Sequence, residues 1–171
     1  MCGIIGAMLF EGIEDKVMLN MRTEAVIYLM TELLYMTHTR GKDATGIAAL
    51  FADSNYCGLK MGIPSSEFIV RFGEKETDYD GFIKIIRKKD DLRVFLGHCR
   101  KTSVGLAEDN ANNHPIKIGS IIGVHNGTLD NHDVVFEKLK CERDGDVDSE
   151  AIMRLLYFYT KGGKEPFTPA M

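Results

Sequence analysis

Apolar residues along the chain recur with two different periods, and these periods predict both strands and helices. The opening run from Cys2 to Phe10 is apolar, contains β-branched residues and is too short for a helix, which indicates a buried strand. From Glu14 to about Thr37, apolar residues recur at helical spacing and predict one long amphipathic helix with its polar face outward. Methionines in this segment are interpreted as core residues, at positions 18, 21, 30 and 36.

The remaining chain alternates short apolar runs with turn-forming and helical segments. Strands are predicted at Gly46–Phe51, Tyr56–Met61, Arg93–His98 and Ser120–His125, the first two forming a hairpin and the last two buried. Helices are predicted at Phe82–Lys88, from Asp130 or Asn131 to Lys140, and at Ser149–Thr160, with a loop from Gly73 to Asp80. No internal repeat or linker interrupts the chain, so we expect a single domain.

Composition narrows the class of protein further. The 171 residues, 44% of them hydrophobic and 27% charged, suffice for one globular domain with its own core. No apolar stretch approaches the roughly 20 residues of a membrane-spanning helix, and no signal peptide is visible, so we expect a cytoplasmic protein without a membrane partner. A net charge of −4 gives no basic footprint for nucleic acid. The four cysteines form no C-x-x-C pair, and reduced thiols are expected.

Cys2 directly follows Met1, and this position has chemical consequences. Removal of Met1 would leave a thiol and a free α-amine on one residue. The α-amine, with an ordinary pKa of roughly 7.7 to 8.0, could then accept the thiol proton without a histidine partner. The alternative is that Cys2 is simply a small buried residue of the first strand.

Six motifs in a fixed order decide between these readings. They are CGIIG at 2–6, RGKDATGI at 40–47, GHCRKTSVGL at 97–106, NHPIK at 113–117, VHNGTLDNH at 124–132 and DSEA at 148–151. Together they resemble the class II glutamine amidotransferases, most closely those of the glucosamine-6-phosphate synthase and amidophosphoribosyltransferase branches. The resemblance implies an α+β fold, the αββα four-layer sandwich of N-terminal nucleophile hydrolases, spanning 1–171, shortened or incomplete at its C-terminus and without a synthase domain.

The same resemblance implies catalytic roles for three residues. Cys2 would be the nucleophile that attacks the side-chain amide of L-glutamine. Asn126, through its side chain, and Gly127, through its backbone N–H, would form the oxyanion hole. The γ-glutamyl thioester would then be hydrolysed to glutamate, and the ammonia would pass to a synthase domain or to a subunit acting in trans.

Substrate recognition is assigned in the same way. Arg100 matches the arginine that binds the α-carboxylate of glutamine, for which a planar guanidinium is well suited. Asp148 matches the acid that binds the α-ammonium group, and it could also cap the helix that follows. Ser103 and His125 are the further substrate-binding candidates.

Arg40, Gly41 and Asp43 match the family segment that closes the pocket around the N-terminus. Neither a cofactor nor a metal is expected, because the histidines of the GH, HP and HNG motifs show no tight ligand spacing. Lys101 departs from the pattern, since the glucosamine-6-phosphate synthase branch has an aromatic residue there. Two alternatives stay open: a catalytically silent glutamine-binding or interaction module, and an acylase for other amides. The missing strands imply either a shortened chain or a second polypeptide that completes the fold.

Overall fold

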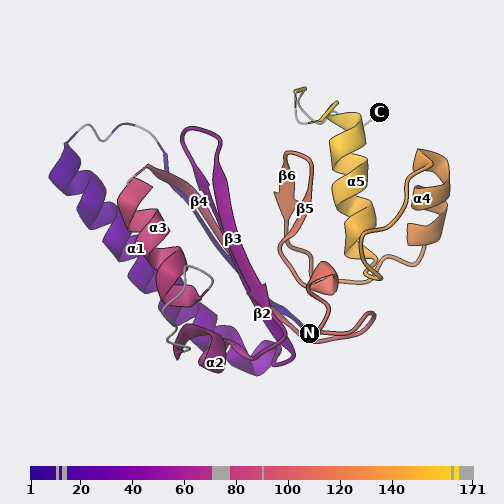
Figure 1. Ribbon diagram of the computed structural model, residues 1–171, viewed down its shortest axis with the longest axis horizontal. Helices are drawn as coiled ribbons and strands as arrows, with labels where there is room; N and C mark the ends of the chain where they lie inside the picture. The colour runs from indigo at the N-terminus through magenta and orange to yellow at the C-terminus, as the bar shows by residue number, and fades with distance from the viewer. Residues whose placement is uncertain (11, 13–14, 71–77, 90, 163, 166–171) are drawn as a thin grey trace.

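The computed structural model describes residues 1–10, 12, 15–70, 78–89, 91–162 and 164–165 (Figure 1). Its strands are β1 (Gly3–Met8), β2 (Ala44–Phe51), β3 (Tyr56–Met61), β4 (Leu92–Arg100), β5 (Ile116–Ile118) and β6 (Ile121–Gly123). Its helices are α1 (Lys16–Met36), α2 (Ser65–Val70), α3 (Tyr79–Lys89), α4 (His132–Leu139) and α5 (Ser149–Tyr159), with 3₁₀ turns η1 (Thr37–Arg40) and η2 (Asn110–Asn112). The predicted α+β class is confirmed.

The main sheet is antiparallel, and its strand order is β1-β4-β2-β3. In this register Gly3 of β1 and Thr45 of β2 both lie opposite Cys99 of β4. The end of β4 is therefore flanked by the starts of β1 and β2. This pairing brings three motifs that are distant in sequence to one end of the sheet.

Helices α1, α2 and α3 cover one face of this sheet (Figure 1). Alternate strand residues point into this interface, as the period of two requires. The buried core between helices and sheet includes Ile5, Ile27, Met30, Leu34, Ile47, Phe51, Phe82, Ile86 and Phe95. Phe82 and Phe95 meet edge to face with ring centroids 5.6 Å apart, an arrangement that aromatic quadrupoles favour.

The opposite face of the sheet looks toward the β5–β6 hairpin, and α5 lies beyond that hairpin (Figure 1). A second, smaller core joins hairpin and helix through Ile116, Ile118, Val147 and Met153. The two sheets are not in close contact everywhere. A cavity of about 260 Å³ separates them, with Leu50, Val94 and Leu96 on one side and Ile121 and Ile122 on the other.

The prediction of a polar outer face on the first long helix was wrong. Tyr28 and Tyr35 are 69% and 61% exposed on the outer side of α1, so apolar residues occupy both faces. Of the four methionines assigned to the core, only Met30 is buried, whereas those at 18, 21 and 36 are exposed. The helix begins at Lys16 because Asp15 accepts a hydrogen bond from the N–H of Met18 at 2.9 Å. The predicted start at residue 14 lies outside the described residues.

Two short elements escaped prediction, because six residues in α2 and three in β5 are too few to establish a period. Of the predicted loop at 73–80, residues 73–77 lie outside the described residues, while Tyr79 and Asp80 already belong to α3. The strand predicted from Ser120 to His125 is observed as β6, which ends at Gly123 and is only partly buried. Among the described residues, no helix combines the length and apolar character needed to cross a membrane.

Candidate active site

Cys2 lies beside the end of β4, where its thiol contacts the main chain of Lys101. The Lys101 N–H donates to Sγ of Cys2 at 3.3 Å, and Sγ lies 3.6 Å from the Lys101 carbonyl oxygen. If the thiol were deprotonated, the Lys101 N–H could still donate its hydrogen bond to the thiolate. The residue type at 101 differs from the family pattern, but the contact with the thiol uses only its backbone.

Asn126 holds both ends of the Cys2 backbone. The Cys2 N–H donates to Oδ1 of Asn126 at 3.3 Å, and Nδ2 of Asn126 donates to the Cys2 carbonyl at 3.1 Å. The β6 strand ends at Gly123, so residues 124–127 leave the hairpin as irregular chain and can reach Cys2. The amide side chain assigned to the oxyanion hole therefore lies next to the assigned nucleophile.

The 40–43 segment encloses the N-terminus from the other side. Arg40 donates from Nε to the Cys2 carbonyl at 3.1 Å. Asp43 donates its N–H to the Arg100 carbonyl at 3.0 Å and accepts from the Thr102 N–H at 2.6 Å. Both contacts tie the start of β2 to the chain that leaves β4.

Gly41 allows a close approach of two backbones. A Cβ at this residue would lie 2.4 Å from the Arg100 carbonyl carbon and 2.4 Å from the Cys99 oxygen, both backbone atoms that cannot rotate away. Only glycine fits at this position. The conformation itself is extended and unstrained, so the requirement is one of space.

Arg100 is buried, and carbonyls of its own loop surround its guanidinium. Nη1 donates to Oδ1 of Asn113 at 2.9 Å and to the Leu106 carbonyl at 3.5 Å. Nη2 donates to the carbonyls of Val104 and Gly105, the latter at 3.1 Å. The side chain therefore shapes the 104–106 loop in this structure.

Burial and nearby charges act in opposite directions on the Arg100 guanidinium. Burial lowers the pKa of its guanidinium, and the nearby Cys2, Asp43 and Asp148 act in the opposite direction. Arginine stays protonated even after such a change. The thiol and both carboxylates of the predicted site thus lie near enough to Arg100 for their charges to act on its guanidinium.

Asp148 is 8% exposed and does not cap α5 with its side chain, so the capping interpretation was wrong. Its Oδ2 instead accepts from the Leu129 N–H, and its Oδ1 accepts from the Ser149 hydroxyl at 3.4 Å. The carboxylate is thereby turned toward the 124–132 segment. It joins the start of α5 to the loop that carries Asn126.

The remaining predicted residues lie in two different environments. Ser103 is exposed, and within the described chain it forms no hydrogen bond. His125 is half-buried, and its Nδ1 lies 3.0 Å from the Ser149 hydroxyl. A Cβ on Gly127 would lie 2.8 Å from Nε2 of His125, so the ring packs directly against this glycine. His125 therefore contacts the segment assigned to the oxyanion hole.

Sequence reasoning did not assign a role to Asn113, although the residue stands in a quoted motif. It is fully buried, accepts from Arg100 and donates from Nδ2 to the Ala107 carbonyl at 2.6 Å. Its own carbonyl accepts from Nζ of Lys60 at 2.8 Å. Asn113 is distinguished by its burial between two cations, Arg100 and Lys60. The spacing of residues in the sequence does not show which residues are buried.

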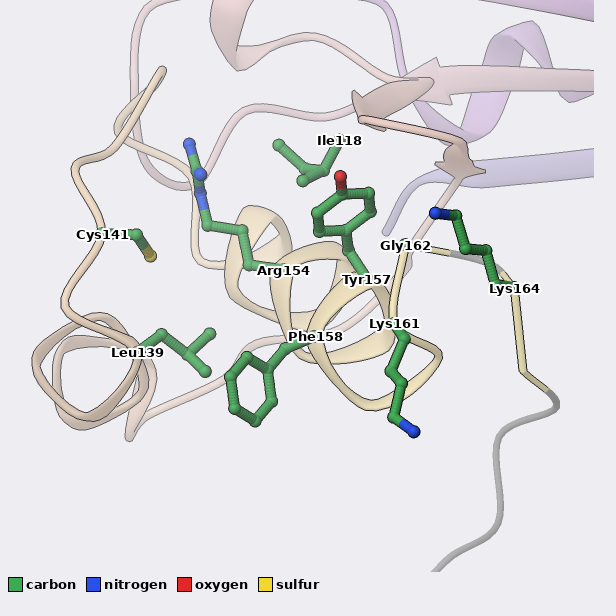
Figure 2. Close-up of a pocket in the computed structure, with 9 residues that line it drawn as sticks. All are labelled: Ile118, Leu139, Cys141, Arg154, Tyr157, Phe158, Lys161, Gly162 and Lys164. Carbon is green, nitrogen blue, oxygen red and sulfur yellow. The ribbon is translucent and has the colours of Figure 1, made fainter.

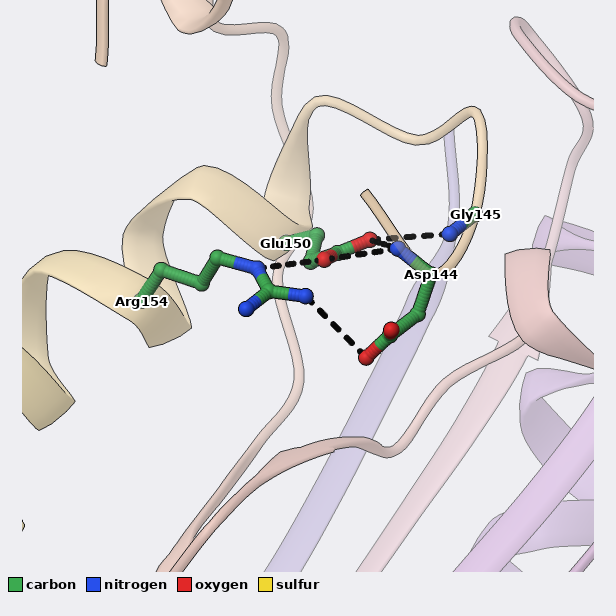
Figure 3. A network of polar contacts seen from close by, with 4 residues as sticks. All are labelled: Asp144, Gly145, Glu150 and Arg154. Atoms are coloured by element: carbon green, nitrogen blue, oxygen red, sulfur yellow. Dashed lines mark hydrogen bonds and ion pairs between the residues drawn. The ribbon is translucent and has the colours of Figure 1, made fainter. Parts of the chain in front are cut away.

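A buried carboxylate organises the turn that leads to Asp148 (Figure 3). Glu150 accepts from the N–H groups of Asp144 and Gly145 at 2.9 to 3.1 Å and from Nε of Arg154 at 2.6 Å. Arg154 also pairs with Asp144 at 3.1 Å. The network fixes residues 144–145 on the first turns of α5.

A cavity of about 480 Å³ opens on α5 away from the predicted site residues (Figure 2). Ile118, Leu139 and Tyr157 supply its apolar wall. Two of the cations that line it, Arg154 and Lys161, are paired with Glu150 and Glu165. None of the residues assigned to glutamine chemistry lines this cavity. The described residues contain no group of three or more side chains suited to a metal.

The resemblance to a class II glutamine amidotransferase domain is confirmed by comparison with known proteins. The chain is 30% identical over 171 residues to the glutamine–fructose-6-phosphate aminotransferase (isomerizing) of Sulfurisphaera tokodaii, and the match covers 98% of this chain and 25% of that protein. It is also 30% identical over 172 residues to the protein of the same name from Sulfolobus acidocaldarius, with the same coverage. A 27% identity over 169 residues relates it to that of Xylella fastidiosa, over 96% of this chain and 23% of the relative.

The chain thus spans about a quarter of the length of these curated relatives. That quarter is their N-terminal part. No family model matches the chain.

Proposed function

We propose that this chain hydrolyses L-glutamine to glutamate and ammonia through a γ-glutamyl thioester on Cys2. The observation that carries the proposal is the contact between the Cys2 backbone and the side chain of Asn126, at 3.1 and 3.3 Å, with the thiol beside the Lys101 N–H. The names of the relatives support glutamine as the nitrogen donor.

The first step requires that Met1 has been removed, so that the backbone nitrogen of Cys2 is a free α-amine. The amine accepts the thiol proton, and the thiolate attacks the side-chain amide carbon of glutamine. Asn126 Nδ2 and the Gly127 N–H stabilise the oxyanion that forms. The C–N bond then breaks, and the departing nitrogen takes the proton from the amine and leaves as ammonia.

In the second step, water attacks the thioester carbonyl. The α-amine accepts a proton from this water, the same oxyanion donors stabilise the second tetrahedral intermediate, and the C–S bond breaks. Glutamate leaves, and the proton returns to the thiolate of Cys2. No redox change occurs in either step.

The head group of glutamine would bind between Arg100 and Asp148. Asp148 is a buried carboxylate whose charge acts on Arg100, and it would supply the negative charge that binds the α-ammonium. Arg100 would bind the α-carboxylate by exchanging carbonyls of residues 104–106 for carboxylate oxygens, which accept charge-assisted hydrogen bonds more strongly. Ser103 would supply a further hydroxyl from the same loop.

We further propose that the fold is the αββα sandwich of N-terminal nucleophile hydrolases. The order of layers supports this: α1 and α3, then the main sheet, then β5–β6, then α5 (Figure 1). The second sheet holds only two strands among the described residues. Ammonia would pass to an acceptor-binding synthase domain or subunit in trans.

The test is covalent labelling of the processed protein with a glutamine-like diazoketone, read by intact and peptide mass spectrometry. We expect one adduct on Cys2 that excess glutamine suppresses, and ammonia release that the Cys2→Ser variant lacks. Labelling elsewhere, or equal ammonia release by Cys2→Ser, would refute the nucleophile. The same spectra report whether Met1 has been removed.

A second candidate, a glutamine-binding module without turnover, rests on a different observation. Three hydrogen bonds hold the Arg100 guanidinium to the carbonyls of residues 104–106, which close the carboxylate site. Calorimetric binding of glutamine by a processed protein that neither labels nor releases ammonia would favour this reading.

A further inference from the structure

Two buried histidines stack behind the candidate active site. His98 lies near the end of β4, and His114 lies in the loop before β5. Their ring centroids are 4.3 Å apart, and the side chains are 1% and 5% exposed. The proposed hydrolysis uses neither ring.

One hydrogen bond distinguishes the two rings. Nε2 of His98 lies 3.2 Å from the carbonyl oxygen of His125, and this oxygen can only accept. Nε2 of His98 therefore carries the hydrogen. Nδ1 of His98 and both ring nitrogens of His114 have no partner within the described chain. Burial lowers the pKa of His98 to about 4, so near neutral pH its ring is a neutral, single donor.

The accepting carbonyl lies in the chain that forms the proposed oxyanion hole. His125 immediately precedes Asn126 and Gly127. Its ring bonds to Ser149 of α5 at 3.0 Å, while its main chain bonds to β4 through His98. Residue 125 is thus held at two points from opposite layers, and Asn126, the next residue, hydrogen-bonds to the backbone of Cys2.

We propose that His98 is a positioning residue for glutamine hydrolysis: its Nε2–H holds the His125 carbonyl and thereby aligns Asn126 and Gly127 with the oxyanion. This inference rests on the proposed function. The alignment matters most in the tetrahedral transition state, where the two donors bind developing charge. Misplacement of such groups by about 1 Å can reduce turnover on the order of 100-fold. Ground-state binding of the glutamine head group does not use these donors.

The matched variants are His98→Phe, His98→Gln and His114→Phe in the processed protein. Phe at 98 keeps an aromatic ring but cannot donate, and we expect kcat to fall about 10- to 100-fold with KM nearly unchanged. Gln at 98 carries an N–H₂ group at the level of Nε2 and should recover most of the lost kcat. Phe at 114 keeps the stack and removes only nitrogens without a partner, so kcat should stay near the parental value.

Parental kcat in folded His98→Phe would overturn the proposal, as would equal losses in all three variants, since these would report packing alone. If His98→Phe does not fold, His98→Asn replaces it. The shorter amide of Asn ends near the level of Nδ1 and cannot reach the His125 carbonyl, so Gln should be active and Asn impaired.

Hydrogen exchange separates failure of this inference from failure of the proposed function. A parental protein that releases no ammonia refutes glutaminase activity. Peptides covering residues 121–129 should then still exchange faster in His98→Phe than in His114→Phe if His98 holds this segment. Equal exchange in both variants overturns the positioning role whether or not the protein is active.

Discussion

Cys2 and Asn126 exchange two hydrogen bonds across 124 positions of sequence, and these bonds join the first strand to the chain leaving β6. The Asn126 amide holds the Cys2 backbone, and under the proposed mechanism the same side chain would also supply an oxyanion donor. The two layers of the molecule are therefore coupled at the reacting centre.

Asn126→Ala should lower kcat for ammonia release by roughly 100- to 1000-fold, the usual cost of one oxyanion donor. Glutaminase assays on folded protein give the measurement. Asn131→Ala is the matched control: Asn131 lies in the same segment and caps α4 without a side-chain hydrogen bond. Near-parental activity of Asn126→Ala would remove Asn126 from the oxyanion hole.

Cys2→Ser should leave the thermal midpoint nearly unchanged and abolish activity. Among the described residues, the thiol hydrogen-bonds only to the Lys101 backbone, at 3.3 and 3.6 Å, and a hydroxyl can keep these bonds. Serine is a much weaker nucleophile when the α-amine is its only base. Thermal unfolding and ammonia release, measured on the same samples, separate the two effects.

Six ordered motifs marked the candidate site in the sequence, and the antiparallel register of β1, β4 and β2 brings three of them together. The surroundings of Arg100 were not predictable. They depend on the path of the 104–106 loop, where Gly105 adopts a φ of 72° and packs on Asn112. The outer face of α1 was mispredicted for a different reason: a helix that is apolar on both faces does not show by spacing which face is buried. The catalytic roles themselves stay predictions.

Gly41→Ala should destabilise the fold and the site together. The new methyl carbon would lie 2.4 Å from backbone atoms of Cys99 and Arg100, so β4 or the 40–43 segment must shift. We expect a loss of about 1–3 kcal/mol of unfolding free energy, the usual cost of overpacking. Gly58→Ala is the control, because its nearest atom would be at 3.5 Å, an ordinary contact. Urea unfolding that shows equal stability for both variants would contradict this.

Glu150→Ala, which removes a buried carboxylate, should be more destabilising than Glu165→Ala, which removes an exposed one. The Glu150 side chain is 3% exposed and accepts from two backbone N–H groups and Arg154, so its removal leaves buried donors unpaired (Figure 3). A cost of about 3–5 kcal/mol is expected for breaking a buried pair. Glu165→Ala breaks the exposed pair with Lys161 and should cost less than about 1 kcal/mol. Chemical denaturation of both variants gives the comparison.

Stability should fall as the pH is lowered below about 6.5, because of the stacked histidines. Burial lowers the pKa of His98 to about 4 and that of His114 to about 2. The hydrogen bond to the His125 backbone opposes this for His98, whereas the charges of Arg100 and His125 lower its pKa further. For His114, the charges of His98, Arg100, His125 and Lys60 all lower the pKa further. Since the folded-state pKa lies below the unfolded value of 6.5, the unfolded chain binds more protons in this window. Full stability is therefore present above pH 6.5 and is lost toward pH 4, with a slope of up to ~1.4 kcal/mol per pH unit for each histidine.

His114→Phe removes one of these titrating groups while keeping the stack. The unfolding free energy of this variant should depend less steeply on pH than that of the parent. Urea titrations at pH values from about 4.5 to about 7.5 measure both slopes. The difference in unfolding free energy should be largest at the acidic end of the range. There the folded parent keeps the His114 ring neutral, whereas the unfolded chain protonates it. Identical slopes would mean that His114 takes up its proton in the folded state, and hence that the ring is accessible to water.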